Sequence, residues 1–205
     1  MQGLMMDMPL LISDLIRHAD RHHGDTEIVS KTVEDGSIHR YTYRDAHRRA
    51  RQLAKALAAL GVKMNDRVAT LAWNGYRHLE LYFGVSGSGR VLHTINPRLH
   101  PDQVVWIANH AEDQVLCFDM TFLPLVQKVH AQCKTIRHYV VLCDSSALPS
   151  DSGIPNLMSY EQWVQGQSEQ YDWPQLDENT ASSMCYTSGT TGNPKAALYS
   201  HRSTL

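Results

Sequence analysis

Cysteine is scarce in this 205-residue sequence, and its four copies form no CxxC pair. They stand at Cys117, Cys133, Cys143 and Cys185, without the regular spacing that a small disulfide-stapled fold would need. Three of them lie in apolar runs, where a free cysteine behaves as a small hydrophobic residue. We therefore expect reduced thiols and a cytoplasmic protein.

The sequence also lacks a strong net charge and a long apolar run. Lys and Arg number 19 and Asp and Glu 21, so the net charge is -2 and nucleic-acid binding is disfavoured. No stretch approaches the roughly 18 to 20 apolar residues that a membrane-spanning helix needs. Residues 1–16 carry acidic but no basic side chains before their apolar run, unlike a signal peptide. We expect a soluble protein with at most peripheral membrane contact.

The sequence does contain an alternation of strand and helix patterns. Strands are predicted at 67–73, 91–95, 114–118, 137–143 and 181–186, and helices at 43–60, 76–86, 102–110, 122–133 (capped by Thr121) and 160–165. Strands separated by helices imply right-handed crossovers. The sequence therefore predicts a doubly wound α/β fold, with a mainly parallel sheet and helices on both faces.

The predicted helix 43–60 carries a basic stripe opposite its apolar face. Arg44, Arg48, Arg51 and Lys55 recur at three- and four-residue steps. Such a stripe suits an anionic membrane surface or a phosphate-bearing ligand. An ordinary solvated helix face has the same pattern, and we favour that interpretation.

The segment 187–195 is the clearest candidate for chemistry. It holds two glycines, four hydroxyl side chains and a final lysine, Lys195. Backbone N–H groups of such a loop can converge on a polyphosphate, a hydroxyl can turn to Mg²⁺, and the lysine adds positive charge. The spacing is not the Walker pattern, because Pro194 stands where a glycine is required. An ordinary Gly- and Ser-rich turn remains the alternative.

The order of residues 186–195, YTSGTTGNPK, resembles the phosphate-binding signature of the adenylate-forming enzymes. This superfamily includes acyl-CoA synthetases, luciferases and the adenylation domains of peptide synthetases. The resemblance extends upstream through 41–43, 66–69 and 96–99. Segments 93–97 and 199–202 look closest to the medium- and long-chain fatty acyl-CoA ligases. Ligases acting on 3-methylthiopropionate match nearly as well.

The resemblance implies a two-step reaction with ATP, a carboxylic acid and coenzyme A. The acid displaces pyrophosphate from ATP, and the thiol of coenzyme A then displaces AMP to leave a thioester. The implied nucleotide-binding residues are Thr187, Ser188, Gly189, Thr190, Thr191, Gly192 and Lys195. Thr187 is the implied Mg²⁺-linked hydroxyl, and Lys195 assists as the loop closes.

The resemblance also implies that much of the enzyme lies beyond residue 205. Residues 1–205 correspond to the N-terminal part of the adenylation domain, ending just after the phosphate-binding loop. The catalytic lysine belongs to the absent C-terminal domain, so we expect no catalytic residue here and no turnover by this chain alone. Its uncovered sheet edges predict self-association, and the intact family is commonly dimeric. A non-catalytic nucleotide-binding remnant is the alternative.

Two positions depart from the family pattern. Ala196 replaces the usual glycine after the lysine, where a Cβ can hinder a positive φ or a close approach. Arg90 replaces a small apolar residue at the start of a strand, so its guanidinium must reach solvent or a partner.

Other candidate sites are set aside. The adjacent His22 and His23 diverge on a helix, so the twelve histidines show no metal-ligand spacing. Gly84, Gly87 and Gly89 lack the third glycine of a dinucleotide loop and indicate close helix packing instead. No GxSxG elbow supports Ser188 and His201 as a nucleophile and base. Tyr76, Tyr82 and Phe83 fit a core or an interface better than an acyl pocket.

Overall fold

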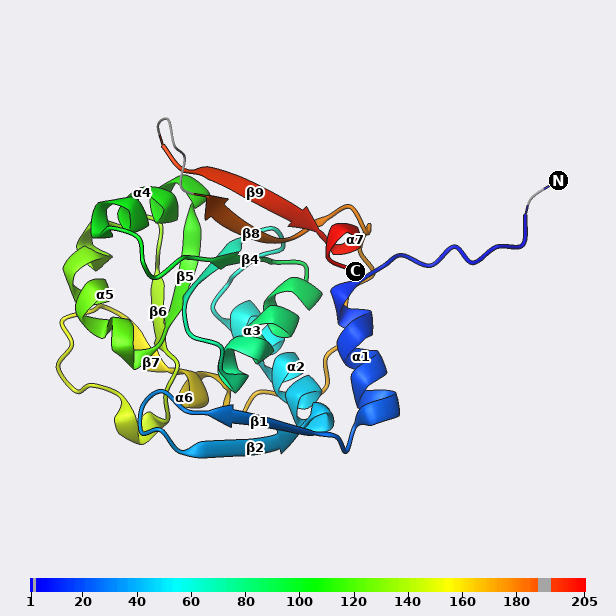
Figure 1. Cartoon of the computed structure of the whole chain (residues 1–205), viewed down its shortest axis with the longest axis horizontal. Helices are drawn as coiled ribbons and strands as arrows, with labels where there is room; N and C mark the ends of the chain where they lie inside the picture. Colours follow the sequence, from blue (N-terminus) through cyan, green and yellow to red (C-terminus); the bar gives the residue numbers. More distant parts are fainter. Residues whose placement is uncertain (2, 188–192) are drawn as a thin grey trace.

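The computed structural model describes residues 1, 3–187 and 193–205. Figure 1 shows a central sheet between helices, with a small hairpin beneath it. The helices are α1 (Ile12–His23), α2 (Tyr43–Ala59), α3 (Tyr76–Gly87), α4 (Pro101–Ala111), α5 (Leu123–Val129), α6 (Tyr160–Val164) and α7 (His201–Thr204), with short 3-10 turns η1 (Met120–Phe122), η2 (His130–Gln132) and η3 (Ser145–Ala147). The strands are β1 (Glu27–Lys31), β2 (Ile38–Thr42), β3 (Arg67–Leu71), β4 (Val91–Thr94), β5 (Asp113–Phe118), β6 (His138–Val141), β7 (Leu157–Ser159), β8 (Ala181–Thr187) and β9 (Lys195–Ser200).

The main sheet has the strand order β7-β6-β5-β3-β4-β8-β9. Every neighbouring pair is parallel except β8 and β9, which run antiparallel. The crossover helices α3, between β3 and β4, and α4, between β4 and β5, cover opposite faces of the sheet, so polar groups can gather where the parallel strands end. The predicted doubly wound α/β fold is confirmed.

Side chains of each central strand alternate between two cores. In β5, Val115 packs on the side of α2, α3 and α6, and the next residue, Leu116, packs on the side of α4 and α5. This period of two is what a sheet covered on both faces requires. The predicted placement of helices on both faces is therefore confirmed.

Helix α2 begins where the sequence predicts because its first turn is capped. The Thr42 hydroxyl accepts the Asp45 N–H at 3.3 Å, and the Asp45 carboxylate accepts the Thr42 N–H at 3.0 Å. This reciprocal pair satisfies two N–H groups that lack helical partners. The basic stripe on α2 is largely engaged with the protein itself: Arg44 pairs with Asp25, Arg48 with Asp45, and Lys55 lies over the Tyr171 ring. The side chains of Arg44 and Arg48 nevertheless stay 61% and 42% exposed, which fits the interpretation of a solvated face.

Helices α2 and α3 pack closely at Gly84. A Cβ added there would lie 2.6 Å from the Leu53 side chain and 3.0 Å from the Ala50 carbonyl oxygen. The glycine thus lets one helix backbone approach the other. This contact confirms the predicted helix packing for Gly84. Gly87 instead lies against Trp173, which belongs to no helix, and Gly89 occupies a turn with a φ of +79°.

Several elements differ from the prediction. The hairpin β1–β2, helix α1 and strands β7 and β9 are not predicted from the sequence. The helix predicted at 122–133 is instead α5 between two 3-10 turns, and Thr121 does not cap it, because the chain already turns at Asp119 and Thr121 lies inside η1. All four cysteines are free thiols. No helix in the described ranges is long and apolar enough to cross a membrane.

Candidate functional site

The hairpin β8–β9 holds the two ends of the predicted phosphate-binding segment. Strand β8 pairs with β4, and its last residue, Thr187, lies directly opposite Lys195 in β9. Opposed residues of an antiparallel pair project from the same face, so the Thr187 hydroxyl and the Lys195 ammonium share one side of the hairpin. Both residues are exposed, and Thr187 Oγ1 donates to the Lys195 carbonyl oxygen at 3.3 Å. The pair offers a hydroxyl and a positive charge at the end of the sheet.

The remaining predicted phosphate-binding residues are Ser188, Gly189, Thr190, Thr191 and Gly192, which lie outside the described residues. Their roles therefore stay predictions. Ala196 lies in β9 opposite Tyr186, and it is exposed. It is not among the residues with a positive φ, so its Cβ causes no strain there.

Tyr186 attaches strand β8 of this hairpin to the neighbouring strand and helix. Its hydroxyl lies 2.7 Å from Nδ1 of His110 on α4, and its ring lies against His93 and Trp106. Burial raises the pKa of Tyr186, so the phenol stays protonated and can donate to His110. The last buried residue of β8 is thereby tied to the helix that covers the sheet.

A buried histidine and aspartate lie next to Tyr186. Nδ1 of His93 is 2.8 Å and 2.9 Å from the two carboxylate oxygens of Asp113, and both side chains are fully buried. Burial raises the pKa of the Asp113 carboxyl, and His93 acts in the opposite direction. Nε2 of His93 has no hydrogen-bond partner among the described residues. The sequence prediction missed this pair, because His93 and Asp113 lie on different strands.

A network of charged side chains ties the β1–β2 turn to the sheet. Arg77 at the start of α3 bonds to Glu34 at 2.7 Å, to Asp144 at 2.8 Å and to Glu161 at 2.8 Å. Arg77 also donates to the Leu142 carbonyl at 3.0 Å. These partners come from the hairpin turn, the segment after β6 and helix α6. One guanidinium therefore joins three separate parts of the chain.

The same network includes a second arginine. Arg49 on α2 bonds to Glu80 at 2.7 Å and to Glu161 at 3.0 Å. Burial raises the pKa of Glu80, which is fully buried. Burial acts in the same direction on Glu161, but Arg49 and Arg77 together hold the pKa of Glu161 below its ordinary value. An open groove of about 820 Å³ runs beside Arg49 and Glu161.

Asp119 follows the carboxyl end of β5 and faces the turn between β1 and β2. It accepts the Trp73 N–H at 2.6 Å and is almost fully buried. Burial raises the pKa of Asp119 from 3.8 to about 6, against the opposing effect of the Trp73 N–H. The ionisation of Asp119 therefore lowers the free energy of unfolding at neutral pH.

We expect Asp119→Asn to stabilise the protein above pH 7. The contribution of Asp119 to stability is fully present below the pKa of the unfolded state, near pH 4. It is lost as the pH rises through the pKa of the folded state, about 6. The variant should gain about 1–3 kcal/mol over the parent at pH 8, and no advantage is expected at pH 4. Urea unfolding at several pH values measures the difference. Asp151→Asn, at an exposed loop position, is the control, and an Asp119→Asn effect that is independent of pH would contradict the prediction.

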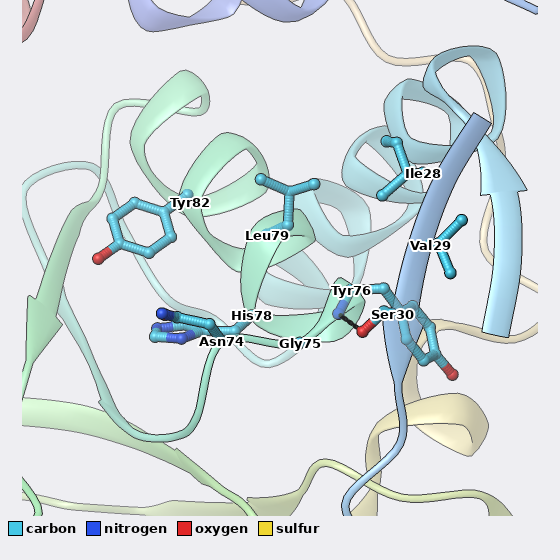
Figure 2. A pocket seen from close by; sticks show the side chains of 9 residues that line it. All are labelled: Ile28, Val29, Ser30, Asn74, Gly75, Tyr76, His78, Leu79 and Tyr82. Carbon is cyan, nitrogen blue, oxygen red and sulfur yellow. Dashed lines mark hydrogen bonds between the residues drawn. The ribbon is translucent and has the colours of Figure 1, made fainter. Parts of the chain in front are cut away.

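A separate cavity of about 290 Å³ lies between β1 and the start of α3. Figure 2 shows Ile28, Val29 and Leu79 on its apolar side, with Asn74, His78 and Tyr82 on the other. The Ser30 hydroxyl accepts the Tyr76 N–H at 3.1 Å and fixes the helix start. Its lining contains no Lys, Arg, Asp or Glu, so it does not resemble a phosphate site. Tyr76 is buried as predicted for a core residue, whereas Tyr82 is partly exposed at the cavity.

The other sequence predictions have clear outcomes. Arg90 is buried, and it finds partners in the Val62 carbonyl oxygen, at 2.6 Å and 3.0 Å, and the Ser88 hydroxyl at 2.7 Å. Burial holds the pKa of the Arg90 guanidinium below its ordinary value. Nδ1 of His201 accepts the Ile12 N–H at 3.2 Å, which is a structural contact. Among residues 1, 3–187 and 193–205, no three or more His, Cys, Asp or Glu side chains are grouped to hold a metal.

Comparison with known proteins points to one family. The model of the AMP-binding enzyme family matches residues 15–205. The chain is 51% identical to a 3-methylmercaptopropionyl-CoA ligase of Ruegeria lacuscaerulensis and 46% identical to a medium-chain-fatty-acid–CoA ligase of Ectopseudomonas oleovorans, in both cases over its whole length. It spans 38% and 37% of the lengths of these relatives.

A solved structure shows the same fold. The anthranilate CoA ligase AuaEII, in complex with anthranoyl-AMP, superposes with a TM-score of 0.82 at 23% sequence identity. The superposition covers 98% of this chain and 37% of that one.

Proposed function

Because this chain belongs to the AMP-binding enzyme family, we propose that residues 1–205 form the N-terminal part of the adenylation domain of an ATP-dependent acyl-CoA ligase. The observation that carries the proposal is the family match over residues 15–205, together with the hairpin that presents Thr187 and Lys195 side by side. The reaction joins a carboxylic acid to coenzyme A through an acyl-adenylate, releasing pyrophosphate and AMP.

The proposed nucleotide site uses the segment between β8 and β9. Lys195 supplies positive charge to the phosphates, and the further phosphate-binding residues are Ser188, Gly189, Thr190, Thr191 and Gly192, as their order in the sequence implies. This arrangement binds and orients the phosphates without a covalent bond to the protein.

Thr187 fits the proposed magnesium site. Its hydroxyl donates to the Lys195 carbonyl, so its lone pairs remain available to a hard cation. Mg²⁺, when bound, neutralises charge on the phosphates of ATP. The side chain of Thr187 would hold the ion from the end of β8.

The acid substrate has two candidate classes. Medium- and long-chain fatty acids are the first class, and the relative from Ectopseudomonas oleovorans favours the medium-chain acids among them. A short sulfur-containing acid, 3-methylthiopropionate, is favoured by the higher identity to the ligase from Ruegeria lacuscaerulensis.

The remaining parts of the reaction belong outside these residues. We place no catalytic residue in this chain, and we expect no turnover by the 205 residues alone, because they span 38% or less of the relatives' length.

The free thiols favour a cytoplasmic location. Among the residues that the structure describes, strand β9 pairs with a neighbour on one side only, and such an edge favours self-association.

We expect Lys195→Ala to weaken binding of Mg·ATP by at least about tenfold, because it removes a charge-assisted contact worth about 1.5–3 kcal/mol. Isothermal titration of the chain measures this affinity, with Gly189→Val as a second test of the loop. Lys134→Ala, at an exposed position in another loop, is the matched control. A folded chain that binds no Mg·ATP, or binds it equally well without Lys195, contradicts the proposed site.

A further inference from the structure

Three histidines gather at the end of helix α1, far from the proposed nucleotide site in sequence. His18, His22 and His23 are all exposed, on a helix that is anchored by the buried Ile12 and Ile16. The adjacent pair, His22 and His23, diverges on the helix. Once residues 12–23 are helical, His18 and His22 stand four positions apart on one face.

The two imidazoles lie next to each other in the structure. The ring centroids of His18 and His22 are 4.6 Å apart and the rings are tilted by 40°. His23 is farther from His18, at 5.8 Å with a tilt of 57°. Two neighbouring imidazoles held by one helix face can direct a nitrogen each toward a shared point in solvent.

We propose that His18 and His22 form a bidentate surface site for a first-row divalent transition-metal ion such as Ni²⁺, Cu²⁺ or Zn²⁺. Imidazole suits these ions, whereas Mg²⁺ prefers oxygen ligands. Both side chains are exposed, so water fills the remaining coordination positions. The site lies in the last two turns of α1, where the helix dipole favours a cation.

Neighbouring acidic groups are already engaged. Asp14, one turn before His18, pairs with Arg17 at 3.0 Å. Asp20 pairs with His47 of α2 at 2.7 Å. The pair of histidines is therefore the whole protein ligand set, in agreement with the lack of any three-residue metal cluster in the described ranges. Such a site binds reversibly and differs from the closed four-ligand sites that hold structural zinc.

Metal binding at this position should stabilise the protein. The ion bridges two consecutive turns of α1, which unfolding would separate. Helix α1 is joined to α2 through Asp20 and His47, and Trp173 Nε1 donates to the other nitrogen of His47 at 3.0 Å. An ion that stabilises α1 therefore also stabilises a helix that is held to α2 by these contacts.

The test uses the untagged 205-residue chain titrated with NiCl₂ and CuCl₂, and with MgCl₂ as the hard-ion comparison. We expect one Ni²⁺ or Cu²⁺ per chain, a thermal midpoint that rises with the concentration of either ion, and no such response to Mg²⁺. Affinity should fall as the pH is lowered, because the ligating imidazoles must be deprotonated.

Matched variants decide which histidines hold the ion. His18→Gln and His22→Gln should each weaken binding by at least about tenfold, and both should lose the thermal response. His23→Gln, on the same exposed helix end, should retain both. Circular dichroism without metal checks that the variants are folded. Unchanged binding in His18→Gln or His22→Gln, or no binding by the parent chain, would overturn the proposal.

Discussion

Replacing Arg77 by Met is expected to lower the free energy of unfolding by about 3–5 kcal/mol, the usual cost of leaving buried charges without a partner. Glu34 would lose its cationic partner while only 7% of its side chain is exposed. Glu161 and the Leu142 carbonyl would each lose a hydrogen bond as well. Urea unfolding followed by far-UV circular dichroism measures the loss.

The comparison for Arg77 is an ion pair of similar length on the surface. Arg40 bonds to Glu27 at 2.6 Å, but both side chains are more than half exposed. Arg40→Met should cost no more than about 1 kcal/mol, since exposed pairs are screened by water. Adding Glu34→Gln to Arg77→Met should recover part of the loss, because it removes an unpaired buried charge. Equal effects of Arg77→Met and Arg40→Met would refute the assigned role of Arg77.

Gly84→Val is expected to destabilise the protein by about 3 kcal/mol, at the upper end of what overpacking a core costs. The new side chain would press on Leu53, which is fully buried, and on the Ala50 carbonyl oxygen. Because the Ala50 carbonyl oxygen belongs to the helix backbone and cannot rotate away from the valine, α2 and α3 must move apart. Thermal and urea unfolding both report the change.

The control for Gly84→Val is Ala58→Val, at an exposed position of α2. It introduces the same β-branched side chain into a helix, and only the small propensity difference, under about 1 kcal/mol, should remain. Combining Gly84→Val with Leu53→Ala should cost less than the sum of the two single changes, because Leu53→Ala makes room for the valine. Strict additivity would show that the helix contact at Gly84 is not the cause.

The main sheet could be predicted because its strands are buried and separated by amphipathic helices. Strand β3, at Arg67–Leu71, is buried at its last four residues, and α2 repeats its apolar residues at helical spacing. The hairpin β1–β2 could not be predicted, because one side of each strand faces solvent and the pattern mixes charged and apolar residues. Strand β7 has three residues, too few for a period to appear.

The candidate site was predicted only where its residues are consecutive. Thr187 and Lys195 belong to one continuous motif, so their order in the sequence identifies them. Arg77, Glu34 and Glu161 lie on three separate elements, and only the folded chain brings them together. The His18 and His22 pair was missed for another reason: on a helix the adjacent His22 and His23 diverge, and the pair that shares a face is the less obvious one, four positions apart.

The position of β8 in the sheet has a consequence for how the chain acquires its structure. Strand β4 receives β8 as its neighbour through pairs such as Leu92 with Ser183, whereas β3, β4 and β5 follow one another closely in the chain. During synthesis on the ribosome, one edge of β4 therefore stays open until β8 emerges. Contacts so far apart in sequence form slowly, because chain entropy is lost before the contact is gained. Among the strands described, β8 and β9, which carry Thr187 and Lys195, are thus expected to join a sheet whose other strands are already paired.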